Sequence, residues 1–239
     1  MRGWYAGAYA VGVTSERVDY PGEGLAEGAL ASTPLAQVRR WLDAATQRQA
    51  ATGDVPEPAC LAVATVDAGG APNVRAVLLR FLDENGIGFV TNTRSTKSVE
   101  IAANPAVAAT LTWPAMFRAI RFRGIAEPLP RDQIEAYFRE RPWGSRISAW
   151  ASQQSAPVAD RAELEASYER YAGQFPERGR PDDVPVPEFW GGYLIRCREV
   201  EFWAGRSNRL HDRLVFSSLN EGPANLDHSG SWRVSRRQP

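Results

Sequence analysis

The spacing of hydrophobic residues changes near residue 59. Before that point, apolar residues between 35 and 45 fall three or four positions apart, which predicts an amphipathic helix. Thr33-Pro34 is typical of a helix start and Gly53 of a helix end. Residues 1–33 are rich in Gly, Ala and Glu and lack this spacing. We therefore expect a mobile N-terminal arm over 1–33 and a single domain over 34–239.

After residue 59, short apolar runs bounded by turn residues predict strands. These runs cover 60–66, 73–81, 87–91, 107–113, 119–127, 192–203, 209–217 and 231–236. Turn sequences at 67–70 and 83–86 join the first three runs and indicate an antiparallel meander. Further helices are expected over 98–104, 131–140 and 160–174.

This alternation predicts the fold class. Six to eight strands that pair mainly with sequence neighbours, with helices between them, are typical of an α+β protein built on an antiparallel barrel. A doubly wound parallel sheet is disfavoured. No Gly-x-Gly-x-x-Gly follows a predicted strand and no Walker A motif is present, so neither of those nucleotide sites is indicated.

Charge and composition narrow the function classes. Lys+Arg and Asp+Glu both number 28, so the zero net charge argues against a broad nucleic-acid or membrane surface. No apolar run is long enough for a membrane span, and the N-terminus lacks the features of a signal peptide. Cys60 and Cys197 lie far apart, and His211 and His228 are the only histidines, so no metal site is expected. A reducing, cytoplasmic location is the expectation.

Lys97 is the only lysine, since arginine supplies every other basic residue. The abundance of Ala, Gly and Pro suggests a GC-rich coding bias that replaces Lys with Arg. A lysine retained against that bias suggests a need for its compact ammonium group. The alternative is that it is retained by chance.

Arg209-Leu210-His211-Asp212-Arg213 is the densest group of candidate functional residues. On a strand, Arg209, His211 and Arg213 would share one face. Two guanidinium groups and an imidazole on one face repel one another unless an anion lies between them. The alternative is a solvated strand face with carboxylate partners nearby.

Two further segments suit anions. In the run 75–80, strand geometry places Arg75 and Arg80 on opposite faces, so one strand could bind two anions, one on each face. Residues 91–98 form a loop rich in hydroxyl and cationic side chains before a helix, and such a helix start suits a phosphate. The alternatives are a strand with charged ends and a capped surface loop.

Tyr137, Arg141 and Ser145 recur at a spacing of four residues. On a continuous helix they would form one stripe, although Pro142 disfavours helix at Arg141. A phenol, a guanidinium and a hydroxyl together could hold a phosphate.

Taken together, these segments resemble the pyridoxamine 5'-phosphate oxidase family, FMN enzymes with a split-barrel fold. The similarity runs in order along nearly the whole chain. Its segments are Met1-Arg2-Gly3-Trp4-Tyr5, Arg75-Ala76-Val77-Leu78-Leu79-Arg80, Thr91-Asn92, Tyr137-Phe138, Arg141-Pro142, Trp150-Ala151-Ser152-Gln153-Gln154-Ser155, Phe189-Trp190-Gly191-Gly192-Tyr193, Glu201-Phe202-Trp203, Arg209-Leu210-His211-Asp212-Arg213 and Arg237-Gln238-Pro239. The implied fold is an antiparallel split β-barrel with flanking helices.

The resemblance implies FMN held at a homodimer interface. Arg75, Lys97 and Ser155 match positions near the FMN phosphate, and Trp203 and Arg213 match positions around the flavin ring. The full set of implied cofactor positions is Arg75, Ala76, Val77, Leu78, Leu79, Arg80, Val90, Thr91, Thr96, Lys97, Gln154, Ser155, Trp203 and Arg213.

The resemblance also implies a substrate site. Arg209 and His211 match the catalytic residues over the substrate ring. The positions that hold the substrate phosphate are Arg80, Tyr137, Arg141 and Ser145. Arg2 and Tyr5 match an N-terminal segment that closes on the site.

Three positions depart from the family pattern. Arg80 stands where the family usually has Lys, and Thr96 stands where an Arg is common, with Arg94 as a nearby compensation. Ala119 replaces a Gln that commonly faces the flavin edge, which removes a hydrogen-bond partner.

The implied activity is oxidation of pyridoxine 5'-phosphate or pyridoxamine 5'-phosphate to pyridoxal 5'-phosphate. Dioxygen is the acceptor, hydrogen peroxide is released, and the amine also yields ammonia. One alternative is a related flavin oxidase recruited to another ring substrate, as in phenazine assembly. Another is a non-catalytic flavin or pyridoxal-phosphate carrier, which only the Thr96 and Ala119 departures support.

Overall fold

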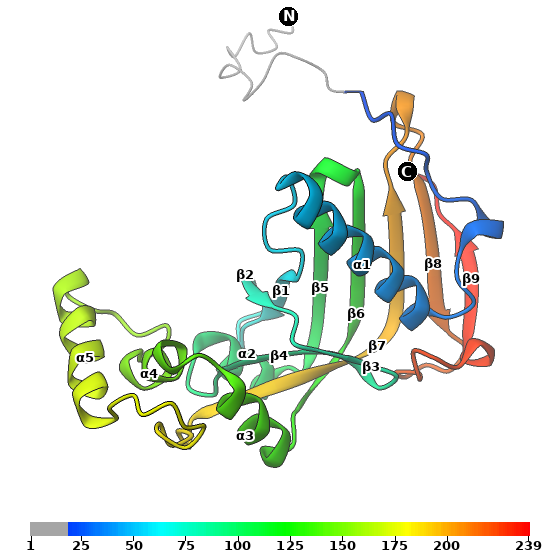
Figure 1. The fold of residues 1–239 in the computed structure, drawn as a ribbon. Helices are drawn as coiled ribbons and strands as arrows, with labels where there is room; N and C mark the ends of the chain where they lie inside the picture. Colours follow the sequence, from blue (N-terminus) through cyan, green and yellow to red (C-terminus); the bar gives the residue numbers. More distant parts are fainter. Residues whose placement is uncertain (1–18) are drawn as a thin grey trace, which may run out of the picture.

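The computed structural model describes residues 19–239. In this range, one curled antiparallel sheet has α1 across one face and the other helices gathered at one end (Figure 1). The strands are β1 (Cys60–Val66), β2 (Pro72–Leu78), β3 (Phe81–Asp83), β4 (Gly86–Asn92), β5 (Ala106–Trp113), β6 (Arg118–Pro128), β7 (Trp190–Ala204), β8 (Asp212–Ser218) and β9 (Trp232–Arg236). The helices are α1 (Pro34–Thr52), α2 (Thr96–Ala103), α3 (Arg131–Glu140), α4 (Trp143–Ala151) and α5 (Arg161–Gln174). The predicted α+β class with an antiparallel sheet is confirmed.

The strand β7 connects two parts of the sheet, whose order is β2-β1-β5-β6-β7-β4-β3 with β8 and β9 added beside β7. Its first part pairs with β4 and its last part with β8, while β6 runs along both. The register of β6 shifts between Arg123 and Gly124. A Cβ on Gly124 would lie 2.0 Å from the carbonyl oxygen of Arg196, so the bulge requires glycine.

The main core lies between α1 and the sheet. Leu35, Val38 and Trp41 of α1 are buried there, and the Trp41 ring meets the Phe202 ring edge-on at 5.4 Å. The side-chain oxygen of Thr33 accepts a hydrogen bond from the Ala36 N–H at 3.2 Å, a cap that contributes about 1 kcal/mol to helix stability. Helix α1 ends at Gly53, whose φ of 72° is the left-handed conformation that glycine adopts easily.

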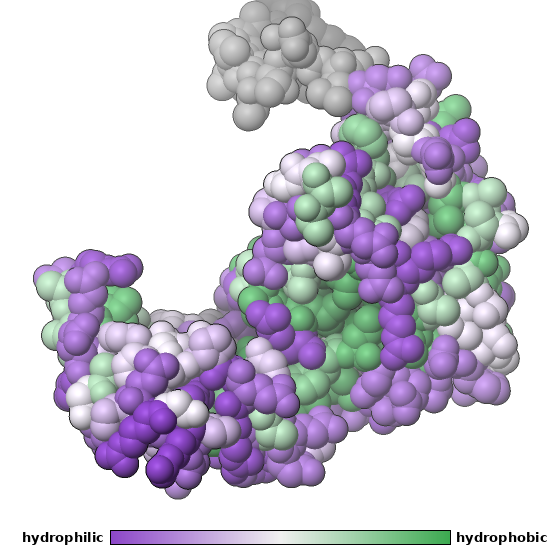
Figure 2. Space-filling view, in the orientation of Figure 1, coloured by the Kyte–Doolittle hydropathy of each residue, from purple (hydrophilic) through white to green (hydrophobic). Residues whose placement is uncertain are grey.

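A second, smaller core joins α3 and α4 to the first residue of β7. Ile134, Phe138, Ile147 and Trp190 are its large buried members. Helix α5 packs on α4 and extends away from the sheet (Figure 1). Figure 2 shows a hollow between this helical part and the barrel, with apolar residues gathered over the strands below α1.

Several details of the sequence prediction are wrong. The run 73–81 is two strands, because the chain leaves β2 after Leu78 and β3 begins at Phe81. The first strands form two hairpins, β1–β2 and β3–β4, that lie at opposite ends of the sheet order, so they are not a meander. Helix α4 is not anticipated by the sequence, and the strand expected over 209–217 begins only at Asp212.

The mobile N-terminal arm expected over 1–33 stays a prediction, and its residues 1–18 lie outside the described range. Residues 27–29 form a short 3-10 helix, and the Leu25 N–H donates to the Asp212 carboxylate at 2.8 Å. A single domain over 34–239 stays a prediction. Among residues 19–239, no helix is both long and apolar enough to cross a membrane.

Candidate active site

A cavity of about 650 Å³ lies between β2, β4 and the α3–α4 turn. It brings together most of the residues singled out from the sequence. Those that line it are Arg75, Ala76, Val77, Leu78, Arg80, Val90, Thr91, Lys97, Tyr137, Arg141, Ser145 and Gln154. We call it the basic cavity, because its lining holds four cationic side chains and one carboxylate, that of Glu140.

The geometry of Arg75 and Arg80 differs from the strand prediction. Because β2 ends at Leu78, the two-residue period does not extend to Arg80, and both arginines line the same cavity. The Arg75 guanidinium donates to the Glu100 carboxylate at 2.8 Å. Leu79, an expected cofactor position, instead buries its side chain in the main core.

Lys97 lies at the start of α2 and is largely buried. Its ammonium group donates to Gln154 Oε1 at 2.7 Å, to Thr91 Oγ1 at 3.1 Å and to Ser95 Oγ at 3.2 Å. Burial and the nearby Arg75 lower the pKa of Lys97 to about 8, although Glu100 opposes the shift. A bound anion would favour the charged ammonium form.

Arg141 lines the basic cavity and also carries a buried, unsatisfied donor. Its guanidinium lies 4.4 Å from the centre of the Trp190 ring. Its Nη1 is buried and has no hydrogen-bond partner among residues 19–239. Burial lowers the pKa of Arg141, but a guanidinium keeps its charge in proteins. A buried, charged, unpaired donor is costly, so this site is complete only with an acceptor such as a phosphate oxygen.

Ser155 and Thr96 lie beside the basic cavity and not in its lining. The Thr96 N–H donates to Ser155 Oγ at 3.2 Å, and Ser155 has a left-handed φ of 74°. Both line a neighbouring groove of about 860 Å³. Arg94, expected to compensate for Thr96, also lines that groove and lies over the Phe189 ring at 5.0 Å.

The segment 209–213 contradicts the strand-face prediction. Ser207–Arg209 is a short 3-10 helix in which Asn208 and Arg209 have positive φ values, and β8 starts only at Asp212. The alternation of faces therefore does not place Arg209, His211 and Arg213 together. Trp203 at the end of β7 links them instead: the His211 ring is 4.7 Å from the Trp203 ring, and Arg213 pairs with Trp203 across β7 and β8. Arg209 is close enough to His211 to lower its pKa. We call Trp203, Arg209, His211 and Arg213 the β7–β8 site.

His211 is anchored in this arrangement by a hydrogen bond at Nδ1. The Arg206 N–H donates to His211 Nδ1 at 3.1 Å, so the neutral ring carries its proton on Nε2. Burial and the Arg209 guanidinium lower the pKa of His211, against the opposing effect of Asp212. The imidazole can therefore donate a hydrogen bond from Nε2 near neutral pH.

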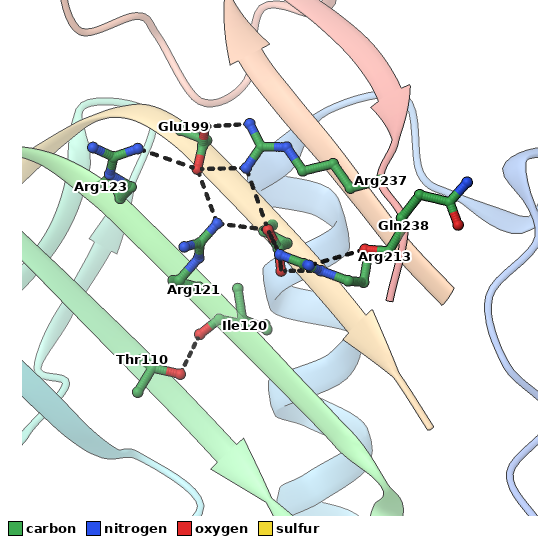
Figure 3. A network of polar contacts seen from close by, with 9 residues as sticks. Thr110, Ile120, Arg121, Arg123, Glu199, Arg213, Arg237 and Gln238 are labelled. Carbon is green, nitrogen blue, oxygen red and sulfur yellow. Dashed lines mark hydrogen bonds and ion pairs between the residues drawn. The ribbon is translucent and has the colours of Figure 1, made fainter. Parts of the chain in front are cut away.

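Arg213 is held on one side by Glu201. Arg213 Nε and Nη2 donate to the two Glu201 oxygens at 2.9 and 3.0 Å, and Nη1 donates to the Gln238 carbonyl at 3.0 Å (Figure 3). Arg121 and Arg237 reach the same carboxylate (Figure 3). This network fixes the orientation of the Arg213 guanidinium.

Tyr20 is a candidate that the sequence reasoning missed. Its ring packs edge-on against His211 at 5.3 Å and against Trp203 at 6.2 Å. The expected residues Arg2 and Tyr5 lie outside the described range. A signal was available, because the spacing Arg-x-x-Tyr occurs at Arg2–Tyr5 and again at Arg17–Tyr20.

The basic cavity and the β7–β8 site lie at opposite ends of one strand. Trp190 of β7 lines the cavity, and Trp203 of the same strand belongs to the β7–β8 site. At the usual rise of about 3.3 Å per residue, about 40 Å of strand lies between them, measured along the curve of β7 (Figure 1). One chain therefore cannot bring both groups to a single small ligand.

Comparison with protein families gives two matches. Residues 48–175 match the family described as pyridoxamine 5'-phosphate oxidase. Residues 190–239 match the pyridoxine 5'-phosphate oxidase C-terminal dimerisation region.

Among curated relatives, two proteins named pyridoxine/pyridoxamine 5'-phosphate oxidase are similar over most of the chain. The one from Kineococcus radiotolerans is 47% identical, over 93% of this chain and 97% of the relative. The one from Streptomyces avermitilis is 45% identical, over 93% of this chain and 94% of the relative.

Two solved structures share the fold. PhzG from Burkholderia lata, in complex with tetrahydrophenazine-1-carboxylic acid, matches with a TM-score of 0.77 at 26% identity, over 91% of this chain and 99% of that one. An FMN-binding protein from Nostoc punctiforme matches with a TM-score of 0.63 at 19% identity, over 84% and 97%. The predicted split-barrel fold is confirmed.

Proposed function

The chain belongs to the pyridoxamine 5'-phosphate oxidase family, and we propose on this basis that it oxidises pyridoxine 5'-phosphate or pyridoxamine 5'-phosphate to pyridoxal 5'-phosphate. Dioxygen is the acceptor and hydrogen peroxide the second product. The observation that carries the proposal is the basic cavity, whose lining holds four cationic side chains and one carboxylate and therefore suits anionic ligands.

FMN is the cofactor, and the residues present fit its phosphate. Lys97, Arg75 and Thr91 supply charge and hydrogen bonds in the lining of the basic cavity, together with Gln154, and Ser155 lies beside it. When bound, FMN supplies the redox chemistry by accepting a hydride from the substrate and passing electrons to dioxygen. The protein supplies position and electrostatic field.

The substrate phosphate fits a second group of residues in the lining of the basic cavity. Tyr137, Arg141 and Ser145 line it together with Arg80. Arg80 still supplies a cation where the family usually has Lys, but with a planar set of donors. A phosphate cradle favours a phosphorylated vitamer over the unphosphorylated ring acid named in the PhzG complex.

The complete site requires two copies of the chain. The flavin-ring residues Trp203 and Arg213 and the substrate-ring residues Arg209 and His211 lie about 40 Å from the phosphate end, measured along β7 at the usual strand rise. The match to a dimerisation region supports a homodimer. In this arrangement, the β7–β8 site of one protomer completes the basic cavity of its partner.

The direct test is steady-state oxidation by the purified protein loaded with FMN. Pyridoxine 5'-phosphate should give pyridoxal 5'-phosphate and an equal amount of hydrogen peroxide. Tetrahydrophenazine-1-carboxylic acid serves as the competing substrate. Turnover of that acid alone would overturn the substrate assignment, and a protein that binds no FMN would overturn the whole proposal in favour of a carrier without flavin.

The position of Lys97 predicts how FMN affinity depends on pH. Its pKa of about 8 in the free protein means that the ammonium is already charged at pH 7 and neutral at pH 10. Binding of the FMN phosphate favours the charged form, so above pH 8 binding must take up a proton. The dissociation constant for FMN should therefore rise by up to about tenfold per pH unit above pH 8.

Titration of the apoprotein with FMN between pH 7 and 10, followed by quenching of flavin fluorescence, measures this dependence. Lys97→Arg is the matched control, because it keeps its charge and should show a nearly flat profile. Lys97→Ala should bind FMN more weakly throughout, by about 10- to 100-fold for a lost charge-assisted contact. A wild-type profile that is flat up to pH 10 would contradict the assignment.

Tyr20 should contribute to substrate binding through its contacts with His211 and Trp203. Removing an aromatic contact of this kind costs about 0.5–1.5 kcal/mol, so Tyr20→Ala should lower kcat/KM by up to about tenfold, mainly through KM. Tyr5→Ala is the matched comparison within the other Arg-x-x-Tyr segment. Steady-state kinetics, with flavin content measured alongside, show which tyrosine contributes to substrate binding. A larger fall in kcat/KM for Tyr5→Ala than for Tyr20→Ala would reverse the assignment.

A further inference from the structure

Glu201 is a buried carboxylate that the proposed reaction does not use. It lies on β7, two residues before Trp203, and is 5% exposed. Three arginines converge on it from three other parts of the chain: Arg121 from β6, Arg213 from β8 and Arg237 after β9 (Figure 3). Such a carboxylate is stable only because it is paired on several sides.

The contact with Arg213 differs from the other two. Arg213 donates to both oxygens of Glu201 through Nε and Nη2, which is the two-point geometry that fixes a guanidinium in orientation as well as in position. Arg121 reaches one oxygen at 2.6 Å, and Arg237 lies 3.5 Å from that same oxygen. A guanidinium has five N–H donors, and the contacts to Glu201 and Gln238 use three. Within residues 19–239, two donors of Arg213 are therefore left for a ligand.

We propose that Glu201 is a positioning residue, which fixes the Arg213 guanidinium so that its two remaining donors face the flavin ring. This rests on the proposed function, which places Arg213 beside that ring. Register supports the placement, because Arg213 pairs with Trp203 across β7 and β8, and Trp203 pairs with Ala119 across β6 and β7. A row of three cross-strand neighbours, Arg213, Trp203 and Ala119, is therefore assigned to the flavin edge. Glu201 lies two residues before Trp203 on β7, so its side chain is next to this row.

Glu199 supplies a matched control on the same strand face. Its carboxylate accepts hydrogen bonds from Arg121 at 3.2 Å and from Arg237 at 2.7 Å, and the Arg123 guanidinium lies 3.9 Å away. Among the described residues, its ion pairs do not include Arg213. Removing either carboxylate thus changes the charge of the same network by one, but only Glu201 orients Arg213.

The experiment is a double-mutant cycle on FMN binding to the full-length apoprotein. Glu201→Gln replaces one of the two acceptor oxygens by an NH₂ group, so one donor of Arg213 meets another donor. We expect the dissociation constant for FMN to rise by about tenfold in the wild-type background and by less than about twofold in the Arg213→Ala background. Glu199→Gln should change it by less than about twofold in both backgrounds.

Other outcomes would overturn the inference. An equal loss from Glu201→Gln in both backgrounds would show that the carboxylate acts through the fold and not through Arg213. A loss of similar size from Glu199→Gln would assign the effect to network charge. If Glu201→Gln does not fold, Glu201→Asp replaces it, with the same dependence on Arg213 expected. Wild-type protein that binds no FMN would instead refute the proposed function as well.

Discussion

Replacing Arg209 with Ala should lower kcat/KM for pyridoxine 5'-phosphate by about 100-fold or more, equivalent to about 2.7 kcal/mol. The proposed site places this guanidinium over the substrate ring, where removal of a hydride redistributes charge. A fixed cation that stabilises charge mainly in the transition state affects turnover more than ground-state binding. The fall should therefore appear largely in kcat.

The local backbone gives Arg209 this position. Asn208 and Arg209 both have left-handed φ values, 58° and 62°, so the chain turns sharply between β7 and β8. Residues other than glycine keep a left-handed conformation only where the surrounding structure fixes them. Such conformations cluster at functional sites. The His211 ring next to Arg209 is anchored by the Arg206 N–H.

The measurement combines steady-state kinetics with flavin content. Arg209→Ala should stay folded and yellow, because Arg209 does not line the basic cavity in which we propose that the FMN phosphate binds. Arg206→Ala is the control in the same loop, where the side chain pairs with Asp212 at 3.4 Å. His211→Ala should raise KM more than it lowers kcat. Near wild-type turnover of Arg209→Ala, or flavin loss as its main defect, would refute the assignment.

The sequence predicts elements well where periodicity is strong. The apolar positions of α1 and the alternating residues of β5 and β6 lead to the observed helix and strands within one or two residues. It fails where partners are distant in the chain. Turn residues locate the β1–β2 and β3–β4 hairpins, but nothing local indicates that β5 pairs with β1 or that β4 pairs with β7.

The candidate site shows the same division. The phosphate-binding residue types at Arg75, Lys97 and Arg141 are readable as chemistry, and they do line one cavity. The Arg209–Arg213 segment is misread because period two assumes extended backbone, whereas Asn208 and Arg209 adopt left-handed φ. Helix α4 is missed because Gly144 and the preceding Pro142 weaken its helical signal. Tyr20 is missed because it lies in a segment without periodicity.

Because the basic cavity and the β7–β8 site of one chain lie at opposite ends of β7, we expect two inactive variants to restore activity when they form a heterodimer. An Arg141→Ala chain has a damaged basic cavity, and an Arg209→Ala chain has a damaged β7–β8 site. Each homodimer should be nearly inactive, since both of its sites carry one lesion. In the heterodimer of these two chains, one site carries both lesions and the other carries none.

Co-expression of the two variants with different affinity tags, followed by two-step purification, isolates that heterodimer. Because one of the two symmetric sites is then intact, its activity should be about half that of the wild-type dimer. The control heterodimer pairs Arg209→Ala with His211→Ala, two lesions of the same half-site, so each of its sites stays damaged and no recovery is expected. If the activity of the Arg141–Arg209 heterodimer were only the mean of the activities of the two variant homodimers, each active site would be built from one chain. The 40 Å separation along β7, about 3.3 Å for each residue of the strand, makes that outcome incompatible with the placement of the two groups.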